Sequence, residues 1–176
     1  KNPVAFISQS AMFDFYDGGG LDATCVGMAQ VDAEGNVNVS KLGPMAIGCG
    51  GFINITQNTK KVIFCGEFRA KGTQVAISEN GLRIEQEGAV AKFVEKVDQI
   101  TFSGRQAART GNKVMYVTER CVFELTPDGL LLTELAPGID LEGDVLSKMA
   151  FRPKVAAEIK TMDLRVFRDQ PMGVSG

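Results

Sequence analysis

The stretch GCGGFINITQNTKKVIFCG, residues 48–66, joins a glycine-rich turn to two short segments of different character. Residues 52–59 follow the glycines directly and can open a helix, whereas residues 60–65 are a short apolar run with a basic entry. A continuous apolar run of this kind is typical of a buried strand that is covered on both faces. The order of loop, helix and strand therefore predicts an α/β arrangement at this point of the chain.

The rest of the chain contains mainly strand patterns. Residues 21–31 are apolar with strand character, and residues 36–40 alternate like a half-exposed strand after a turn at 32–36. Asp140 is a plausible N-cap for a helix over residues 141–149, and residues 93–97 can form a short helix. Strands dominate, so the sequence predicts an α/β or α+β domain. Further strands are expected at residues 114–118, 121–125 and 130–135, the last of them after a turn at 126–129.

The run SENGLRI, residues 78–84, has two interpretations. A Ser-Glu-Asn-Gly run is how one group of enzymes presents a nucleophilic glutamate, which would make Glu79 catalytic. Asn-Gly is also the strongest two-residue hairpin signal, because both residues tolerate positive φ in a type I′ turn. With that loop, Glu79 pairs with Leu82 beside the turn. The same register places four apolar residues on one face of the hairpin: Val75, Ile77, Leu82 and Ile84.

Composition and charge exclude several classes of function. A chain of 176 residues can form one domain with a real core, or a large piece of one. A net charge of −2 argues against nucleic-acid binding, and no apolar run approaches the roughly 18 residues of a membrane span. The absence of histidine removes Ser-His-Asp and Cys-His nucleophile systems and every His-ligated metal site. The four cysteines form no CxxC pair, which is typical of reduced, structural thiols in a reducing cytoplasm.

Two glycine clusters, at residues 18–20 and 48–51, are the candidate binding elements. Consecutive glycines carry a large cost in backbone entropy, so they mark either a tight turn or the close approach of a ligand. A glycine turn ahead of a helix exposes unpaired N–H groups, which suit an anion or a developing oxyanion. The second cluster is not a dinucleotide fingerprint, because Ile53 replaces the third glycine, and it is not a P-loop.

Carboxylates are plentiful, but no spacing singles out two of them as the paired acids of a glycosidase. Charged residues in strands are most often surface or ion-pair residues. Glu119 and Arg120, between two predicted strands, can form a simple structural pair.

Longer blocks of the sequence carry a family resemblance. Together they resemble the C-terminal part of family I coenzyme A (CoA) transferases, and the closest branch is the acetate/propionate, short-chain acyl-CoA transferases. The resemblance runs from about residue 12 to residue 167 in preserved order. It implies that residues 1–176 are the C-terminal portion of the catalytic (second) domain: an open mixed sheet of the CoA-transferase type with flanking helices and an added β-hairpin. The blocks are FDFYDGGGLD, GNVNVSKLGP, GCGGFINITQNTKKVIFCG, KFVEKVDQITFSG, YVTERCVFEL and ELAPGIDL.

The resemblance implies an enzyme that moves CoA between acids such as acetate and propionate. In the family, a glutamate attacks the acyl-CoA thioester, and a mixed anhydride and then a glutamyl-CoA thioester form in a ping-pong sequence. CoA is a substrate, and neither a metal nor a permanently bound cofactor is required. The family's glutamate precedes the FDFYDGGG block, whereas Glu79 follows both glycine clusters. We therefore expect Glu79 to be a hairpin residue, the nucleophile to lie upstream of Lys1, and the chain to be a partial enzyme.

Several site residues follow from the resemblance. Gly50 and Gly51 match the G-x-G-G loop that contacts the oxyanion and CoA through backbone N–H groups, and Gly48 belongs to the same CoA-binding loop. Lys71 matches an Ala-Lys-Gly element of the succinyl-CoA and 3-ketoacid branches, whose lysine approaches CoA. The propionate-like branch tends to have glycine there, so Lys71 is either a CoA contact or a solvated loop lysine. The acyl site is expected to be walled partly by Gly18, Gly19 and Gly20.

Two other functions fit the same residues. A catalytically silent CoA-binding or assembly module would keep the fold without the upstream glutamate, and an acyl-CoA hydrolase would resolve the glutamyl thioester with water. The expected partners are acyl-CoA, a carboxylate, the remainder of the enzyme, and further copies in a homo-oligomer, without nucleic acid or membrane. An interrupted domain should also expose apolar strand edges that need a partner.

Overall fold

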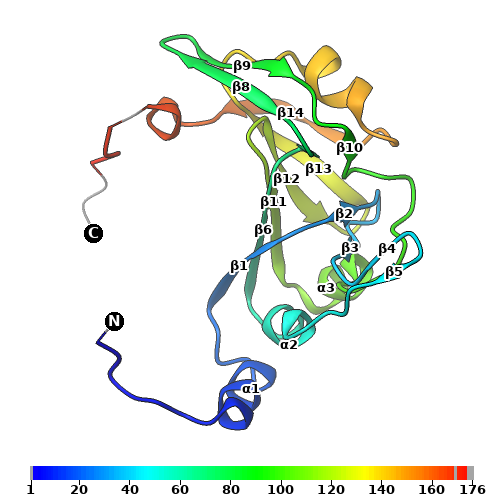
Figure 1. Ribbon diagram of the computed structural model, residues 1–176. Coiled ribbons are helices and arrows are strands. Elements are labelled where there is room, and N and C mark those ends of the chain that lie inside the picture. Colours follow the sequence, from blue (N-terminus) through cyan, green and yellow to red (C-terminus); the bar gives the residue numbers. More distant parts are fainter. Residues whose placement is uncertain (1, 169, 174–176) are drawn as a thin grey trace.

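A mixed β-sheet forms the centre of the protein in the computed structural model, which describes residues 2–168 and 170–173 (Figure 1). In spatial order, the strands of this six-stranded sheet within those residues are β1 (Ala23–Gly27), β6 (Lys61–Cys65), β11 (Lys113–Val117), β12 (Cys121–Thr126), β13 (Gly129–Leu135) and β14 (Lys154–Thr161). The β1–β6, β6–β11 and β13–β14 pairs are parallel, and β12 is antiparallel to both of its neighbours. The predicted open mixed sheet is confirmed.

Short hairpins and helices surround the sheet. The paired short strands are β2 (Gln30–Val31) with β3 (Val37–Asn38), β4 (Lys41–Leu42) with β5 (Met45–Ala46), β7 (Arg69–Ala70) with β10 (Val90–Ala91), and β8 (Gln74–Ser78) with β9 (Gly81–Gln86). The helices are α1 (Gln9–Asp17), α2 (Phe52–Gln57), α3 (Gly104–Thr110), the π-helical turn η1 (Leu141–Val145), and the 3-10 helices η2 (Leu146–Lys148) and η3 (Leu164–Phe167). Figure 1 shows the α-helices toward one end of the sheet and the β8–β9 hairpin at the other.

One face of the sheet is closed by an aromatic core. Successive strand residues point to opposite faces, and Val62, Phe64 and Tyr116 all point to the buried one. The Phe64 ring centroid lies 5.0 Å from that of Phe102 and 5.3 Å from that of Tyr116. Each such buried side chain stabilises the fold by roughly 1.5–3 kcal/mol. The segments that cross this face contribute Val31, Val37, Phe52, Phe93, Phe102 and Ala107 to the core.

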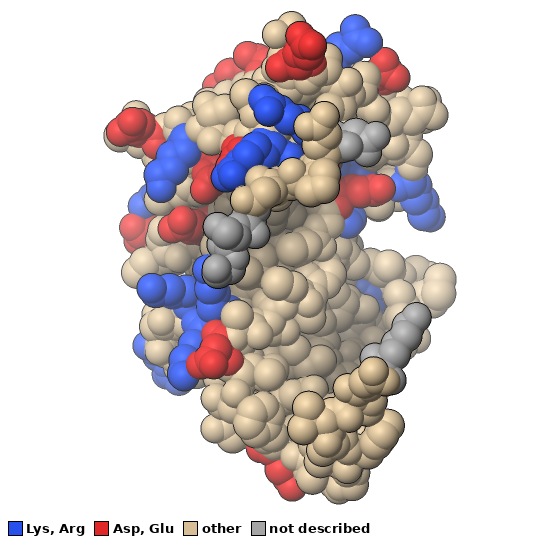
Figure 2. All heavy atoms as spheres, turned by 90° about the vertical axis from the view of Figure 1, so that its left-hand side faces the viewer, with Lys and Arg blue, Asp and Glu red and all other residues tan. Residues whose placement is uncertain are grey.

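The opposite face is covered only in part, and we call its uncovered end, at β1 and β6, the open face. Cys25 and Cys65 are exposed there and Ile63 is half-buried. Residues 60–65 form a strand as predicted, but within the described residues only one of its faces is covered at this end. Figure 2 shows this side as a broad hollow lined mainly by uncharged residues. Toward β12 and β13, the same face is covered by a second cluster of Leu82, Val122, Ala136, Met162 and Phe167.

The predicted hairpin is present, but its turn differs from the predicted one. Ser78 pairs with Gly81, so Glu79 and Asn80 are the loop residues. Of these four residues only Gly81 has positive φ, at +112°, whereas a type I′ turn needs positive φ at both loop residues. A Cβ on Gly81 would lie 2.1 Å from the Pro137 carbonyl oxygen. Gly81 therefore permits a close backbone approach, and this contact fixes the register.

The register shift of two residues keeps the predicted apolar face. Val75 pairs with Ile84 and Ile77 pairs with Leu82, so these four side chains still point the same way. Leu82 alone among them is buried, whereas Val75 and Ile77 are exposed. The hairpin thus covers the sheet at its base and leaves apolar side chains uncovered toward its tip.

The segment at residues 36–40, predicted as a half-exposed strand, is buried except for the half-buried Val39, and only β3 within it is a strand. Asn38 is fully buried because its side chain is satisfied inside the protein. Its Oδ1 accepts from the Ser40 and Lys41 amides at 3.0 and 3.1 Å, and its Nδ2 donates to Gln30 Oε1 at 2.6 Å. A polar residue with all of its hydrogen bonds made can occupy a buried position at little cost.

Two predicted helices differ from the structure. Residues 93–97 form no helix, because Phe93 is buried in the core and bridges to Val31 of β2. Asp140 is an N-cap as predicted, and its Oδ1 accepts from the Gly143 amide at 2.7 Å. The segment after it forms η1 and η2 rather than an α-helix.

Candidate active site

The loop between β5 and α2 holds the second glycine cluster in an open conformation. Gly48 and Gly50 have φ values of +86° and +51°, which glycine adopts at little steric cost. The Gly48 amide donates to the Ser40 carbonyl at 3.0 Å, so it is used within the chain. A Cβ on Gly48 or Gly50 would meet no atom within 4 Å, so the loop is not packed shut.

Two backbone donors of this loop have no acceptor within the part of the chain that the structure describes. The amides of Gly50 and Gly51 are both unpaired there, and no side chain caps α2 at Gly51. Unpaired amides at the start of a helix carry partial positive charge. A Cβ on Gly51 would lie 2.9 Å from the Phe13 ring, so that ring closes one side of the loop. The other side can receive an anionic oxygen.

Asp17 holds α1 against α2 and so positions Phe13 beside Gly51. Its carboxylate accepts from Asn54 Nδ2 at 3.0 Å and from Gln57 Nε2 at 3.1 Å. Its carbonyl oxygen accepts from Asn58 Nδ2 at 2.6 Å. These hydrogen bonds span α2 from its middle to its end, so α1 runs beside it.

The first glycine cluster ends α1, and its amides are used inside the chain. Gly18, Gly19 and Gly20 each donate to a carbonyl oxygen of α1 at 2.9 to 3.0 Å. A Cβ on Gly19 would lie 3.5 Å from the carbonyl oxygen of Asn58, the C-cap of α2. The two clusters therefore lie at opposite ends of α2, about 9 Å apart for six residues at the helical rise. The structure gives these glycines a packing role, and their role in the acyl site stays a prediction.

Lys71 lies in the exposed loop between β7 and β8. Its φ of +63° is the only positive value at a described residue other than glycine. Such a conformation costs of order 1–3 kcal/mol and is a reason to suspect function. Its side chain has no hydrogen-bond or ion-pair partner within the described residues. Its contact with CoA stays a prediction.

Glu79 lies in the exposed tip of the β8–β9 hairpin, within the turn rather than beside it. It borders a groove whose other side is formed by the C-terminal segment, including Leu164 and Phe167. No residue of either glycine cluster lines that groove. The hairpin interpretation of SENG therefore fits the structure, and the nucleophile interpretation does not.

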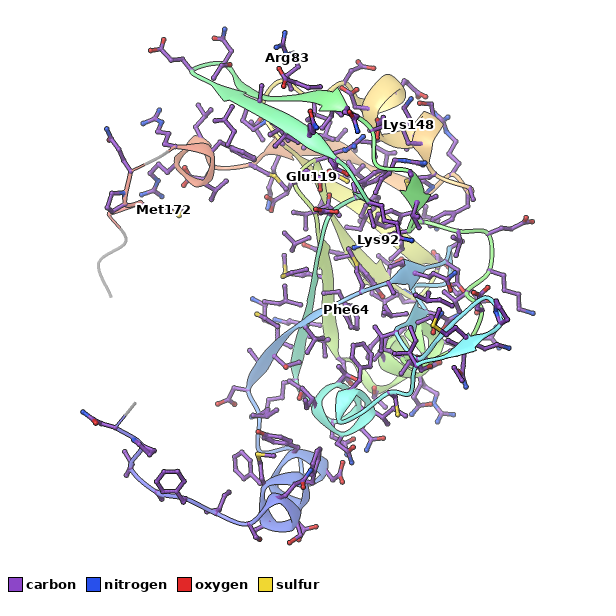
Figure 3. The ribbon with its side chains drawn as sticks, in the orientation of Figure 1. Phe64, Arg83, Lys92, Glu119, Lys148 and Met172 are labelled. Carbon is purple, nitrogen blue, oxygen red and sulfur yellow. The ribbon has the colours of Figure 1, made fainter. Side chains whose placement is uncertain are left out.

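Sequence analysis missed a group of charged residues at the carboxyl ends of the parallel strands β1, β6 and β11. Glu67 follows β6, Glu119 follows β11, and Lys92 reaches the same edge from the segment after β10 (Figure 3). Ligands of open α/β sheets bind at this edge. Burial lowers the pKa of Lys92, and the charges of Glu67 and Glu119 oppose that shift. The predicted ends of the strands at 60–65 and 114–118 already placed Glu67 and Glu119 at one edge, which was the available clue.

Arg120, next to this group, is fully buried and fully paired. It donates from Nε to Glu119 at 2.9 Å and from both terminal nitrogens to Glu87 at 2.7 and 2.8 Å. It also donates to the Asp144 carbonyl at 2.9 Å and stacks over the Phe68 ring at 4.9 Å. The hydrogen bond from Arg120 lowers the pKa of Glu87. The predicted structural pair of Glu119 and Arg120 is confirmed, within a larger network.

All four cysteines are free thiols. Burial raises the pKa of Cys121 to about 12 and also raises that of Cys65. Within residues 2–168 and 170–173, no three of the Cys, Asp and Glu side chains are grouped so that they could hold a metal ion. No helix in the same residues is long and apolar enough to cross a membrane.

Comparisons with known proteins show which enzymes the chain is similar to. The chain is 48% identical over 174 residues to the caffeate CoA-transferase of Acetobacterium woodii, which covers 96% of this chain and 33% of that protein. It is 47% identical over 172 residues to the acetate CoA-transferase YdiF of Escherichia coli K12, covering 98% of this chain and 32% of that protein. The crystal structure of acyl-CoA transferase YdiF from Escherichia coli O157:H7, a thioester complex with CoA, matches with a TM-score of 0.96 at 46% identity. That match covers 99% of this chain and 34% of the YdiF chain.

The chain matches the C-terminal part of a family I CoA-transferase. The predicted resemblance is therefore confirmed, as is the CoA-transferase fold. The chain spans about one third of the length of the curated relatives it matches. No protein-family model matches it.

Proposed function

We propose that this chain is part of a short-chain acyl-CoA:carboxylate CoA-transferase that works through a glutamyl-CoA thioester. The relatives named above support the reaction class. The observation within the chain that supports it best is the pair of unused amides at Gly50 and Gly51, on a loop that is open on one side. Two neighbouring N–H groups without an acceptor suit the oxygen of a thioester under attack.

The chemistry needs a nucleophile and an oxygen-binding site. When a glutamate carboxylate attacks the thioester carbon, the carbonyl oxygen gains negative charge, to which Gly50 and Gly51 donate. The C–S bond then breaks, leaving a mixed anhydride and the CoA thiolate. The thiolate attacks the glutamyl carbonyl, the first acid leaves, and a glutamyl-CoA thioester remains. An incoming carboxylate runs these steps in reverse, and each amide donor is worth about 2.7–4 kcal/mol of transition-state stabilisation.

We place the nucleophile outside residues 1–176. The SENG glutamate, Glu79, lies at a hairpin tip, in a groove that no residue of the glycine loop lines. Glu119 is occupied by Arg120 and by the Phe68 amide, at 2.9 and 2.7 Å. The chain by itself should therefore provide the oxyanion donors and no attacking group.

Isotope exchange on the whole protein tests the proposal. The whole protein should transfer label from acetate into acyl-CoA, and residues 1–176 alone should not. A whole protein that binds acyl-CoA without exchange would favour the non-catalytic module. Loss of acyl-CoA at a rate independent of added acetate would favour the hydrolase.

We further propose that the rest of the same protein covers the open face. The relatives are about three times as long as this chain, so enough polypeptide exists to do so. The hollow in Figure 2 is lined mainly by uncharged residues, which is typical of a permanent, domain-like interface rather than a transient one. The arm at residues 2–8 lies on the same side and exposes Val4, Phe6 and Ile7.

Thiol labelling tests this arrangement. Cys25 and Cys65 are exposed on the open face of the chain, whereas Cys121 is buried in the core. In the native whole protein, we expect Cys25 and Cys65 to react with a thiol reagent as slowly as Cys121, and all three to react after unfolding in urea. Rapid labelling of Cys25 and Cys65 in the native whole protein would show that the face stays open.

A further inference from the structure

Lys92 lies at the edge of the sheet where the parallel strands end. A Cβ on Gly66, directly after β6, would lie 3.0 Å from Lys92 Nζ and 3.8 Å from the Met28 carbonyl oxygen. The ammonium group therefore lies over the ends of β6 and β1 together. Gly27, the last residue of β1, has open space where a side chain would be. The absence of side chains at Gly27 and Gly66 leaves this edge accessible.

The backbone of Lys92 is held firmly, although its side chain is not. Its carbonyl accepts from the Val31 amide at 2.8 Å, and the Val94 amide donates to the Val31 carbonyl at 2.9 Å. Phe93, the next residue, is buried in the core and stacks on Phe68 with ring centroids 4.8 Å apart. The position from which the side chain starts is therefore fixed.

The ammonium group of Lys92 has no fixed anionic partner in the described part of the chain. The side chain is half-buried, yet neither Glu67 nor Glu119 lies within ion-pair distance of its nitrogen. Glu119 already accepts from Arg120 and from the Phe68 amide. Glu67 is exposed. A partly desolvated charge without a partner is unfavourable, and such groups are found where a ligand supplies the partner.

The neighbouring charges select the ligand. Arg120 pairs with Glu119 and Glu87, whereas Glu67 has no ion pair within the described residues and interacts with Lys92 only at longer range. Glu67 repels a dianionic phosphate about twice as strongly as a monoanion, so a ligand with a single negative charge is favoured at Lys92. A small pocket lined by Gly66, Glu67, Thr73, Val75 and Glu119 lies at the same edge, and Lys92 is not among its lining residues. Short-chain acids are small monoanions of this kind.

We propose that Lys92 binds the carboxylate group of the acid substrate at the carboxyl ends of β1 and β6. This inference rests on the proposed function and names the residue that receives its acid. The bound acid would lie beside the exposed glycine edge of the sheet. Lys92 would act by binding and would exchange no proton.

Binding measurements on the whole protein test the proposal. The probes are propionate, followed by saturation transfer to its methyl protons, and free CoA, followed by calorimetry. We expect Lys92→Met to raise the dissociation constant of propionate about 10- to 100-fold, as for loss of a charged hydrogen bond. The dissociation constant of CoA should change less than twofold, and Lys92→Arg should keep most of the propionate affinity.

Two further variants keep the result interpretable. Lys96→Met removes an exposed lysine from the same segment and should leave both constants unchanged. Lys92→Gln keeps a polar side chain and, if Lys92→Met fails to fold, should show the same loss of propionate. Unchanged propionate binding in the Lys92 variants overturns the proposal, and so does a loss of CoA affinity with propionate binding intact. A wild-type protein that binds propionate through Lys92 without isotope exchange would refute the proposed function alone.

Discussion

The two glycine clusters look alike in the sequence and differ in how their amides are used. Gly18 to Gly20 donate all three amides to α1, and this closes the helix. Gly50 and Gly51 leave theirs unpaired within the described residues, at the start of α2. Both clusters accommodate close packing or positive φ, so glycine content alone does not separate them. The hydrogen bonds of their amides separate the two clusters, because an N–H group that already donates within the chain cannot donate to a ligand.

The charged groups show the same contrast. Arg120 is fully buried and its donors are taken up by Glu87, Glu119 and Asp144. Lys92 is half-buried and has no such partner within the described chain. We therefore assign structure to the saturated groups and binding to the open ones.

The largest effect should come from removing one open amide. Gly51 has φ of −84°, which proline can adopt, and Phe13→Ala removes the ring that a new side chain would meet. We expect Gly51→Pro in a Phe13→Ala background to lower kcat for exchange about 10²- to 10³-fold relative to Phe13→Ala alone. A difference below threefold would show that this amide does not contact the reacting oxygen.

The next largest effect should come from breaking the saturated network. Arg120→Met leaves Glu119 without its cation and leaves Glu87 only its longer ion pair with Arg69, at 3.7 Å, and we expect about 3–5 kcal/mol less free energy of unfolding in urea. Arg105→Met, which removes an exposed ion pair with Glu34, should cost under about 1 kcal/mol. A loss of similar size in both variants would contradict the assignment.

The same network predicts a pH dependence. Because the pKa of Glu87 is lower in the folded state, its stabilisation is complete above the unfolded-state pKa. It should be lost as the pH falls through the folded-state pKa. Unfolding curves recorded along an acid series should show a larger loss in the wild type than in Arg120→Met, where Arg69 and Lys148 still lower the pKa of Glu87.

A smaller effect is expected at the first cluster. Gly19 has φ of +77°, so Gly19→Ala should lower stability by roughly 1–2 kcal/mol. Exchange activity should stay within about twofold, because the amides of this cluster are already used. Gly27→Ala, at a position with open space and ordinary φ, is the matched control for stability. A large loss of activity with unchanged stability would move Gly19 into the acyl site.

The smallest effect is expected at the hairpin tip. Glu79→Gln should leave both exchange activity and stability unchanged, because the side chain is exposed and has no hydrogen bond in the described structure. The assay is the same isotope exchange, with Gly51→Pro in its Phe13→Ala background as the positive control. Loss of exchange would restore Glu79 as the nucleophile.

Periodic elements were predictable, and elements that depend on distant partners were not. The strands at residues 60–65, 114–118, 121–125 and 130–135 correspond to β6, β11, β12 and β13, because their apolar patterns are local. The turn of the β8–β9 hairpin was misassigned because Gly81 packs against the carbonyl of Pro137, which is distant in the sequence. A local pattern cannot reveal that contact. Two helices, α1 and α3, were missed although Ser8 and Ser103 cap them.

The candidate site was predictable in part. The glycine loop was identified from its sequence. Which of its amides donate within the described chain depends on the path of the backbone: the amide of Gly48 does, and those of Gly50 and Gly51 do not. Lys92 was missed because no motif marks it. Its position follows only from the edge of the sheet, where Gly66 and the end of β1 come together.

The identity of the attacking glutamate is the most direct test of the central claim. The whole protein is treated with acyl-CoA, the thioester adduct is trapped, and the modified peptide is identified by mass spectrometry. The account predicts one CoA-modified glutamate outside residues 1–176. An adduct on Glu79, or on any other residue of this chain, would contradict it.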